Sequence, residues 1–271
     1  MFKQKSRIIL AAVLLTGIIF VFNFLRQGYI VPVLMYHRVE PVSDGSMLMV
    51  SSSALERQMK FLRDHNYNVI RLKELVGLIK ENKKIPAKTV AITFDDGNKD
   101  NYTCAFPVLK KYRIPATMFV IVDEISRPQG DRLSWEEIKT MLDSGLVDIG
   151  SHTMGPQPLI FIESEDELKR QIFASKKILE NRLGYKIDLF SYPEGFFNAK
   201  IRQLVIDAGY LGAVATNPGR KYPSKDVFLL KRIRISENSS NMFVFAVESS
   251  GFYTIAKEYK KAQKEAKNER R

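Results

Sequence analysis

The chain has 271 residues, which suits one α/β barrel-sized domain with a short extension and leaves room for a large core. Its formal net charge is +12, but the first 28 residues and the tail 257–271 each carry +4, which leaves 12 − 4 − 4 = +4 for the body. Basic ends without a nucleic-acid motif argue against a nucleic-acid partner, and a single cysteine, Cys104, excludes an intrachain disulfide.

Residues 8–25 form an almost wholly apolar run, which Lys3, Lys5 and Arg7 precede. About 20 residues span a bilayer as a helix, so this run is long enough, and the positive flank predicts a cytoplasmic N-terminus. We therefore expect residues 1–28 to form a cytoplasmic stub and a transmembrane signal anchor, with the body outside the cytoplasm. A cleaved signal peptide and a buried core helix are the alternatives, although no small-residue cleavage site follows the run.

From about residue 30 onward, short apolar runs that read as strands alternate with amphipathic segments that read as helices. This alternation predicts parallel strands joined by right-handed helical crossovers. The expected strands are 31–36, 68–70, 89–94, 116–122, 147–150, 188–191, 213–216 and 228–235. The expected helices are 53–65, 72–81, 101–112, 135–143, 165–182 and 199–208, with a weak helical pattern at 239–248. The basic tail 257–271 reads as a solvated helix or as a contact for anionic lipid headgroups or wall polymers.

Two adjacent carboxylates, Asp95 and Asp96, directly follow the expected strand 89–94, and Gly97 then lets the backbone turn. Like charges this close repel each other. A bound cation removes the conflict, because one carboxylate becomes a ligand and the other stays free to move protons. An Asp-Asp-Gly turn that caps the next helix is the alternative interpretation.

Two of the three histidines also follow expected strands, since His37 ends the first apolar run and His152 lies just past 147–150. Parallel α/β barrels gather their working residues at the carboxyl ends of the strands. Neutral imidazole is a common ligand for zinc and similar metals. His65 instead ends a helical pattern, where a surface or C-capping role is expected.

Three segments resemble the signature segments of the polysaccharide deacetylases, the NodB-homology group or carbohydrate esterase family four. They are residues 93–97 (Thr-Phe-Asp-Asp-Gly), 151–153 (Ser-His-Thr) and 190–195 (Phe-Ser-Tyr-Pro-Glu-Gly). Residues 32–37 (Pro-Val-Leu-Met-Tyr-His) resemble the circularly permuted subgroup of N-acetylglucosamine-polymer deacetylases, in which an N-terminal histidine replaces a late catalytic one. Residues 133–135 and 232–235 fit as well, so the resemblance extends from about residue 31 to residue 235.

The resemblance implies an irregular (β/α) barrel of the NodB-homology type over residues 29–256. It also implies metal-dependent removal of N-acetyl groups from an N-acetylhexosamine polysaccharide of a bacterial envelope or its surroundings. For the residues, the resemblance implies that Asp95 is the general base and that Asp96 and His152 are ligands of a divalent metal, with zinc expected. It implies that the backbone N–H of Glu194 donates to the oxyanion and that His37 is the general acid for the leaving amine. Tyr192 and Pro193 are implied as substrate contacts.

The chain departs from the family pattern at the metal site. The family uses an aspartate and two histidines, the second histidine four residues after the first, and that position is Pro156 here. Catalytic zinc sites normally use three protein ligands, so the ion would be weakly held, and the neighbouring Gln157 offers only a poor amide oxygen. Ser191 stands where the family often has an arginine that orients the base, and Glu194 replaces a usual aromatic residue. No motif for the acetyl pocket is visible, since the only tryptophan, Trp135, belongs to an expected helix.

Three functions follow from these observations. The first is an envelope amidohydrolase, which the retained aspartates and histidines favour. The second is a catalytically impaired relative that binds carbohydrate, which Pro156 favours. The third is a membrane-tethered assembly partner in polysaccharide export, with the basic tail as its contact surface. By analogy, the permuted subgroup points to β-1,6-linked N-acetylglucosamine as the polymer.

Overall fold

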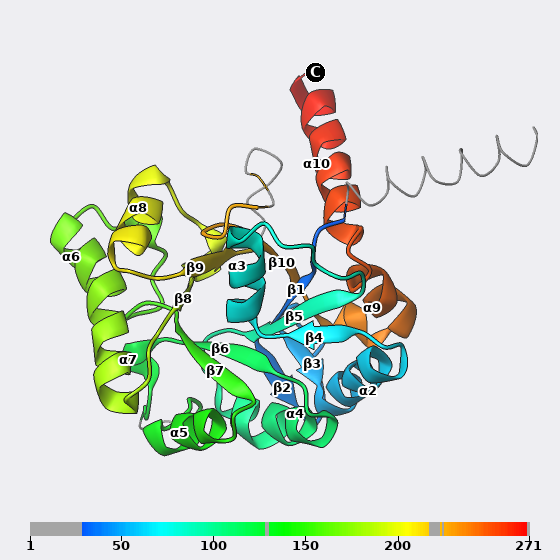
Figure 1. Cartoon of the computed structure of the whole chain (residues 1–271), viewed down its shortest axis with the longest axis horizontal. Helices are drawn as coiled ribbons and strands as arrows, with labels where there is room; N and C mark the ends of the chain where they lie inside the picture. The colour runs from blue at the N-terminus through cyan, green and yellow to red at the C-terminus, as the bar shows by residue number, and fades with distance from the viewer. Residues whose placement is uncertain (1–28, 128–129, 217–222, 224, 270–271) are drawn as a thin grey trace, which may run out of the picture.

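A closed ring of parallel strands forms the centre of the molecule (Figure 1). The computed structural model describes residues 29–127, 130–216, 223 and 225–269. In these residues the strand order is β1-β10-β9-β8-β7-β6-β5, and β5 pairs back to β1 to close the ring. The strands are β1 (Val33–Tyr36), β5 (Thr89–Phe94), β6 (Ala116–Val120), β7 (Val147–Ser151), β8 (Leu189–Ser191), β9 (Gly212–Ala215) and β10 (Leu230–Arg234). The short strand β4 (Asn68–Ile70) pairs with the first half of β5.

Helices surround the ring and connect its strands (Figure 1). They are α2 (Ser52–Asp64), α3 (Leu72–Lys80), α4 (Phe106–Tyr112), α5 (Trp135–Asp143), α6 (Glu165–Lys169), α7 (Ser175–Leu183), α8 (Ala199–Asp207), α9 (Met242–Glu248) and α10 (Tyr253–Glu269). Single turns of 3₁₀-helix are η2 (Val122–Glu124), η3 (Leu159–Phe161), η5 (Pro193–Gly195) and η6 (Glu237–Ser240). The predicted alternation of strands and helices around a barrel is confirmed.

The structure corrects the prediction at several elements. Two short strands, β2 (Arg38–Glu40) and β3 (Met49–Ser51), pair with each other outside the barrel. Neither contains an apolar run from which a strand could be predicted. The predicted helix 101–112 begins with a π-helical turn, η1 (Asn101–Ala105), and the predicted helix 165–182 is interrupted by another, η4 (Arg170–Ala174). The weak pattern at 239–248 divides into η6 and α9, because the Asn241 side chain caps α9.

The predicted membrane anchor, residues 1–28, lies outside the described residues. In the part of the chain that the structure describes, no helix has both the length and the apolar character that crossing a bilayer requires. The predicted boundary at residue 257 falls within α10. A buried ion pair between Lys231 Nζ and Glu258 Oε1, 2.6 Å apart, ties the first turns of α10 to the barrel.

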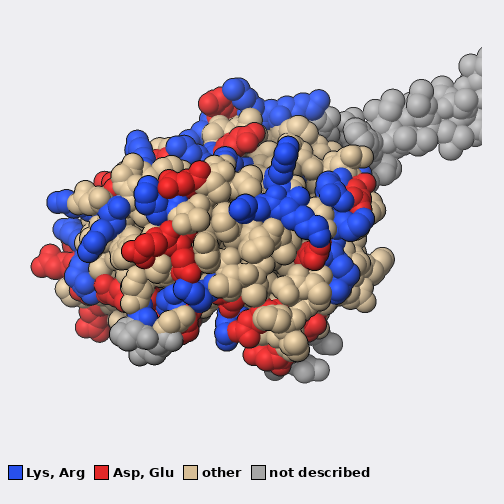
Figure 2. Space-filling view, turned by 90° about the horizontal axis from the view of Figure 1, so that it is seen from below, with Lys and Arg blue, Asp and Glu red and all other residues tan. Residues whose placement is uncertain are grey.

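The surface in Figure 2 carries basic and acidic side chains interspersed. On this face the modest positive charge of the body therefore does not gather into one continuous patch.

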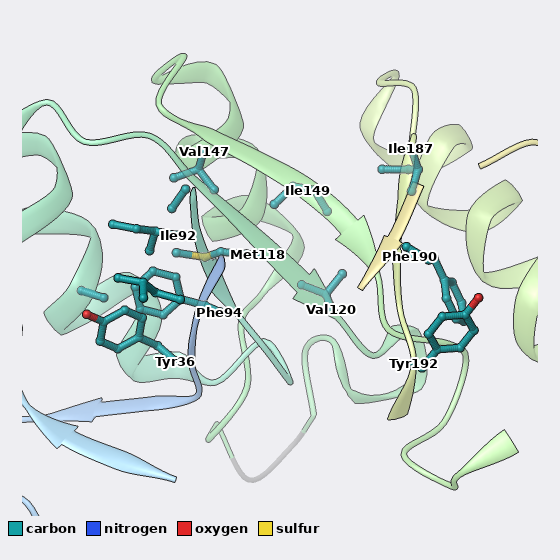
Figure 3. Packing of buried hydrophobic residues seen from close by; sticks show 14 of the residues in the cluster. Tyr36, Ile92, Phe94, Met118, Val120, Val147, Ile149, Ile187, Phe190 and Tyr192 are labelled. Carbon is teal, nitrogen blue, oxygen red and sulfur yellow. The ribbon is translucent and has the colours of Figure 1, made fainter. Parts of the chain in front are cut away.

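Alternation along the strands separates the barrel interior from the shell beneath the helices. Ile92, Phe94, Met118, Val120 and Phe190 belong to the large apolar cluster that the helices cover (Figure 3). Their neighbours along the strands belong to a smaller cluster, which α3 closes at the start of the strands; it includes Val33, Ala91, Phe119, Leu189, Val214 and Leu230. Continuing this alternation places Thr93, Asp95, Ser191 and Arg232 inside the barrel, toward the ends of the strands.

The ring of Phe119 fills the barrel interior so tightly that the facing position on β7 must be glycine. A Cβ on Gly150 would lie 2.5 Å from two ring carbons of Phe119 and 3.0 Å from the carbonyl oxygen of Leu189. Such overpacking costs about 1–3 kcal/mol.

We predict that Gly150→Ala lowers the free energy of unfolding by about 1–3 kcal/mol, measured by urea denaturation. Gly77→Ala in α3 is the matched control, since a Cβ there has no heavy atom within 4 Å. This control should leave stability unchanged or raise it by up to about 1 kcal/mol. Equal effects of the two substitutions would contradict the packing argument.

Candidate active site

One cavity of about 540 Å³ lies at the carboxyl ends of the strands. The side chains that line it come from β10, from the residues that follow β1, β5, β6, β7, β8 and β9, and from Leu48 before β3. The residues with ionisable or polar groups are His37, Asp95, Asp96, His152, Glu194, Thr216, Arg232 and Arg234. The carboxyl end of a parallel barrel is where barrel enzymes place their working residues.

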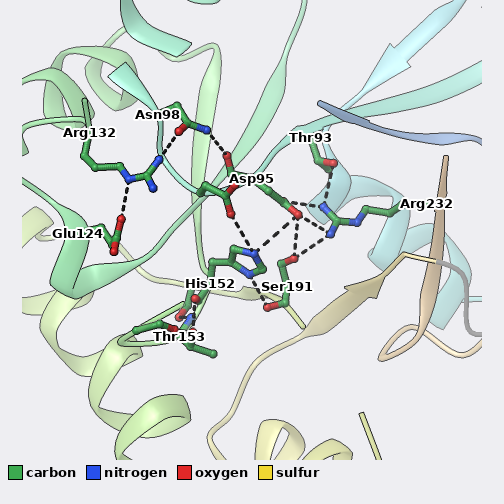
Figure 4. Close-up of polar contacts among 12 residues, drawn as sticks. Thr93, Asp95, Asn98, Glu124, Arg132, His152, Thr153, Ser191 and Arg232 are labelled. Carbon is green, nitrogen blue, oxygen red and sulfur yellow. Dashed lines mark hydrogen bonds and ion pairs between the residues drawn. The ribbon is translucent and has the colours of Figure 1, made fainter. Parts of the chain in front are cut away.

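Asp95 forms a buried ion pair with Arg232, which binds both of its carboxylate oxygens (Figure 4). Arg232 donates from Nη1 to Oδ1 at 2.7 Å and from Nη2 to Oδ2 at 2.6 Å, and the two side chains are 1% and 3% exposed. Arg232 Nη2 also donates to Ser191 Oγ at 2.9 Å. This bidentate geometry is the strongest arrangement of an arginine and a carboxylate, and it fixes the plane of the carboxylate.

The ion pair also sets the protonation state of Asp95. Burial by itself raises the pKa of this carboxyl, but the charges of Arg232 and His152 and the hydrogen bonds from Arg232 lower it from 3.8 to about 2. A folded pKa below the unfolded value stabilises the protein above the unfolded pKa by about 2 kcal/mol. That stabilisation is lost as the pH falls from about 4 through 2.

His152 presents one ring nitrogen to the aspartate pair. Its Nδ1 lies 2.8 Å from the carbonyl oxygen of Ser191, and a carbonyl only accepts, so Nδ1 carries the proton and donates. The lone pair is then on Nε2, which lies 3.6 Å from Asp96 Oδ1 and 3.9 Å from Asp95 Oδ2. A backbone carbonyl that fixes the tautomer in this way is a common support for a metal-binding imidazole.

The pair of Asp96 and His152 fits a cation, because two ligands about 2.0–2.2 Å from one ion lie roughly 3–3.6 Å apart. Their observed separation is 3.6 Å. Within residues 29–127, 130–216, 223 and 225–269, no group of three or more His, Cys, Asp or Glu side chains is placed to hold a metal. Pro156, which stands where the family has its second histidine, lines the cavity, and its side chain has no donor atom.

His37 also lines this cavity. It is distant from Asp95 and Asp96 in the sequence, but the residues after β1 and β5 lie close together because these two strands pair. Its Nδ1 is buried and has no hydrogen-bond partner among the described residues. Burial lowers the pKa of His37, while the charges of Asp95 and Asp96 raise it in part. A protonated His37 therefore gives up its proton more readily than an exposed histidine.

Three residues at the edge of the site have left-handed backbones without being glycine. They are Asp96 with φ 71°, Thr153 with φ 73° and Glu194 with φ 55°. Each conformation is unfavourable for a residue with a side chain, and such strain concentrates at functional sites. The loop after β7 is held by Gln171, whose Oε1 accepts from the N–H groups of Met154 at 3.1 Å and Gly155 at 3.0 Å.

The loop after β5 has its own buried support (Figure 4). Arg132 donates from Nη1 to Asn98 Oδ1 and from Nε to Glu124 Oε2, the latter at 2.6 Å. Asn98 Nδ2 in turn approaches the carbonyl oxygen of Asp95 at 3.5 Å. This chain of contacts links the aspartate pair to η2, and the sequence offered no signal for it.

Most of the predicted site residues come together in the structure. Asp95, Asp96, His37, His152, Pro193 and Glu194 all line the one cavity. Tyr192 is fully buried instead, with its ring centroid 5.3 Å from that of Phe190, and it is not among the lining residues. Trp135 begins α5, as predicted. The roles of these residues stay predictions.

Sequence reasoning assigned no role to Arg232, although it noted that residues 232–235 fit the family. It also treated Ser191 only as the position of a missing arginine. In the structure Arg232 reaches Asp95 from the opposite end of the sequence, and Ser191 completes the contact. The available signal was the pair of arginines at 232 and 234, which follow Lys231 in a strand whose other residues are apolar.

A parallel barrel with an aspartate pair and histidines at the ends of its strands defines a barrel hydrolase with a candidate metal position. The family model described as polysaccharide deacetylase matches residues 82–213. YxkH of Bacillus subtilis (strain 168), which bears the name of the same family, is 34% identical over 209 residues, covering 77% of this chain and 72% of YxkH. The chain belongs to the polysaccharide deacetylase family, which confirms the predicted family and enzyme class.

Two further relatives are informative. The poly-beta-1,6-N-acetyl-D-glucosamine N-deacetylase of Staphylococcus aureus (strain MRSA252) is 29% identical over 200 residues, covering 70% of this chain and 69% of that enzyme. The structure of Streptococcus pyogenes deacetylase PplD in complex with acetate has a TM-score of 0.73 and 27% identity, covering 80% of this chain and 96% of PplD. The match to PplD supports the barrel assignment.

We predict that Arg232→Gln lowers the free energy of unfolding by about 3–5 kcal/mol at pH 7, because it leaves the buried carboxylate of Asp95 unpaired. Urea denaturation measures the loss. The double variant Arg232→Gln with Asp95→Asn should recover part of it, since no buried charge is then left alone. A double variant no more stable than the single one would show that the ion pair is not the cause.

Proposed function

We propose that this chain removes N-acetyl groups from an N-acetylglucosamine polymer, with a divalent cation held by Asp96 and His152. The observation that carries the proposal is the meeting of Asp95, Asp96, His152 and His37 in one cavity. The name of the Staphylococcus aureus relative supports β-1,6-linked N-acetylglucosamine as the polymer.

Each group has a part in amide hydrolysis. A divalent cation supplies a Lewis acid that lowers the pKa of water and polarises the acetyl carbonyl. Imidazole and carboxylate donors suit zinc, which we propose as the ion. Asp95 accepts the proton of the attacking water, and Arg232 keeps it ionised and correctly oriented for that step.

The remaining steps use His37 and the turn after β8. His37 donates a proton to the leaving amine, which its lowered pKa favours once it is protonated. The backbone N–H of Glu194, on the wall of the cavity, donates to the oxyanion. The left-handed backbone of Glu194 is consistent with a turn shaped for that purpose.

Acetate release from β-1,6-linked N-acetylglucosamine oligomers tests this function. With zinc-loaded full-length chain we expect His37→Ala to lower kcat by about 10²–10⁴-fold. His65→Ala, at the C-cap of α2 away from the cavity, should leave kcat unchanged. Removal of the metal with a chelator should abolish release, and added zinc should restore it. No release by the metal-loaded chain from any such oligomer would sink the proposal.

A catalytically impaired carbohydrate-binding or assembly protein is the second candidate, and Pro156 is the observation that favours it. Pro156→His adds the missing donor, so we expect zinc affinity to rise at least about tenfold and activity to rise with it. Pro156→Ala is the matched control, because it changes the same loop position without adding a donor. Equal zinc affinity in the two variants would show that position 156 does not limit metal binding.

We also propose that residues 8–25 anchor the chain in the membrane with the barrel outside the cytoplasm. The apolar run and the positive flank before it support this orientation. Protease added to protoplasts, whose membrane is intact, should cleave the barrel region of the full-length chain. A barrel that is cleaved only after the membrane is lysed would contradict the orientation.

A further inference from the structure

Large apolar side chains are exposed on α9 and at the start of α10. Phe243, which is 78% exposed, and Val247 lie one turn apart on α9. Phe252 and Tyr259 are exposed seven residues apart, where α10 begins. Residues four or seven apart lie on one side of a helix, so each helix presents an apolar stripe outward. We call these four side chains the α9–α10 face.

The described residues begin beside this face. The rings of Tyr29 and Phe252 meet edge to face, with 5.9 Å between their centroids, and the N–H of Ile30 donates to the carbonyl oxygen of Gly251 at 3.0 Å. Tyr29 packs so closely on Gly251 that a Cβ there would lie 2.1 Å from a ring carbon. Figure 1 shows the first described residues at the base of α10, with α9 beside it. These contacts fix the point at which the preceding residues join the barrel.

The proposed anchor keeps this point close to a bilayer. Residues 8–25 end four residues before Tyr29, and four residues span at most about 14 Å. The headgroup layer on each side of the apolar core is about 5–8 Å deep. Tyr29 therefore lies within the headgroup layer or no more than about 9 Å above it. Phe243 lies at most about 20 Å from Gly251, so the whole face is near the bilayer.

The charges around the face suit anionic lipid headgroups. Lys257, Lys260 and Lys264 are exposed on α10. Glu248 and Glu258 are buried. Among the side chains of α9 and α10 that the structure describes, the charges that face outward are thus all basic. A helix that combines lysines with exposed aromatic rings is typical of segments that lie in a membrane interface, and tyrosine favours the headgroup level.

We propose that the α9–α10 face rests on an anionic membrane, with its apolar side chains among the lipid headgroups and the lysines of α10 against the phosphates. This goes beyond the proposed hydrolysis and rests on the proposed anchor, which brings the face to the bilayer. Because α9 follows the carboxyl end of β10 and its connection to α10 contacts Ile30, just before β1, the face runs along the side of the barrel. The catalytic cavity then opens parallel to the membrane plane.

Tryptophan fluorescence in vesicles tests this contact. Trp135 is the only tryptophan, so Phe243→Trp in a Trp135→Phe background places one reporter on the face. With the full-length chain in phosphatidylglycerol vesicles, lipids brominated in their acyl chains should lower the emission of this reporter by about twofold. Phe161→Trp in the same background is the matched control. Residue 161 is also exposed but lies on η3, which follows β7 across the barrel from β10, so its emission should not change.

Two further variants test the lysines and a competing occupant. Lys260→Gln with Lys264→Gln should reduce the quenching at position 243, and unchanged quenching would overturn the assignment of anionic headgroups. Phe243→Cys with Cys104→Ser should stay monomeric under oxidation. A disulfide between two copies would show that a second chain covers the face and would overturn the inference. A melting temperature equal to wild type shows that a variant is folded.

The readouts separate this inference from the proposals on which it depends. Emission at position 243 that is the same with and without bromine overturns it. No acetate is measured, so a failure of the proposed hydrolysis leaves the result standing. If alkaline carbonate extracts the full-length chain from membranes, the anchor fails. The extracted chain is then added to brominated phosphatidylglycerol vesicles, where quenching at position 243 supports the face and its absence overturns it.

Discussion

The structure depends on one buried ion pair, between Arg232 near the end of the last strand and Asp95 at the end of β5. These strands do not touch each other, because β1 lies between them and pairs with both. The arginine therefore crosses the barrel interior behind β1 to reach the carboxylate. Two charges that are 1% and 3% exposed lose their hydration, and replacing such a pair with apolar residues is often neutral or stabilising. Stability alone does not explain why this chain keeps it.

The proposed chemistry gives a reason for the pair. A carboxylate with both oxygens bound by arginine stays ionised at every physiological pH, so no fraction of the enzyme is lost to a protonated base. The same contact lowers the basicity of Asp95, which weakens it as a proton acceptor. What it retains is orientation, since the carboxylate plane is fixed beside the Nε2 of His152. Under the proposed function, the site would rely on the position of Asp95 and on the cation more than on the intrinsic strength of the base.

Sequence patterns predicted much of this architecture. The apolar run 89–94 predicted a buried strand, and the structure shows this strand buried at every position. His37 and His152 both line the cavity because each follows a strand, and parallel strands end on one side of a barrel. Arg232 was not paired with Asp95, because the contact joins residues 137 positions apart and depends on which strands flank β1. The supporting contact between Asn98 and Arg132 was not predicted either, because it also joins residues that are distant in the sequence.

The replacement of the third metal ligand by Pro156 acts on one part of the site only. The groups that fix Asp95, and the carbonyl that fixes the tautomer of His152, come from β8 and β10 and do not depend on the loop that carries Pro156. Under the proposed function, the positioning of the base is therefore separable from metal affinity in this chain. A loosely held ion would reduce turnover while the polymer stayed bound, which places the hydrolase and the carbohydrate-binding candidates on one continuous scale set by the occupancy of the metal site.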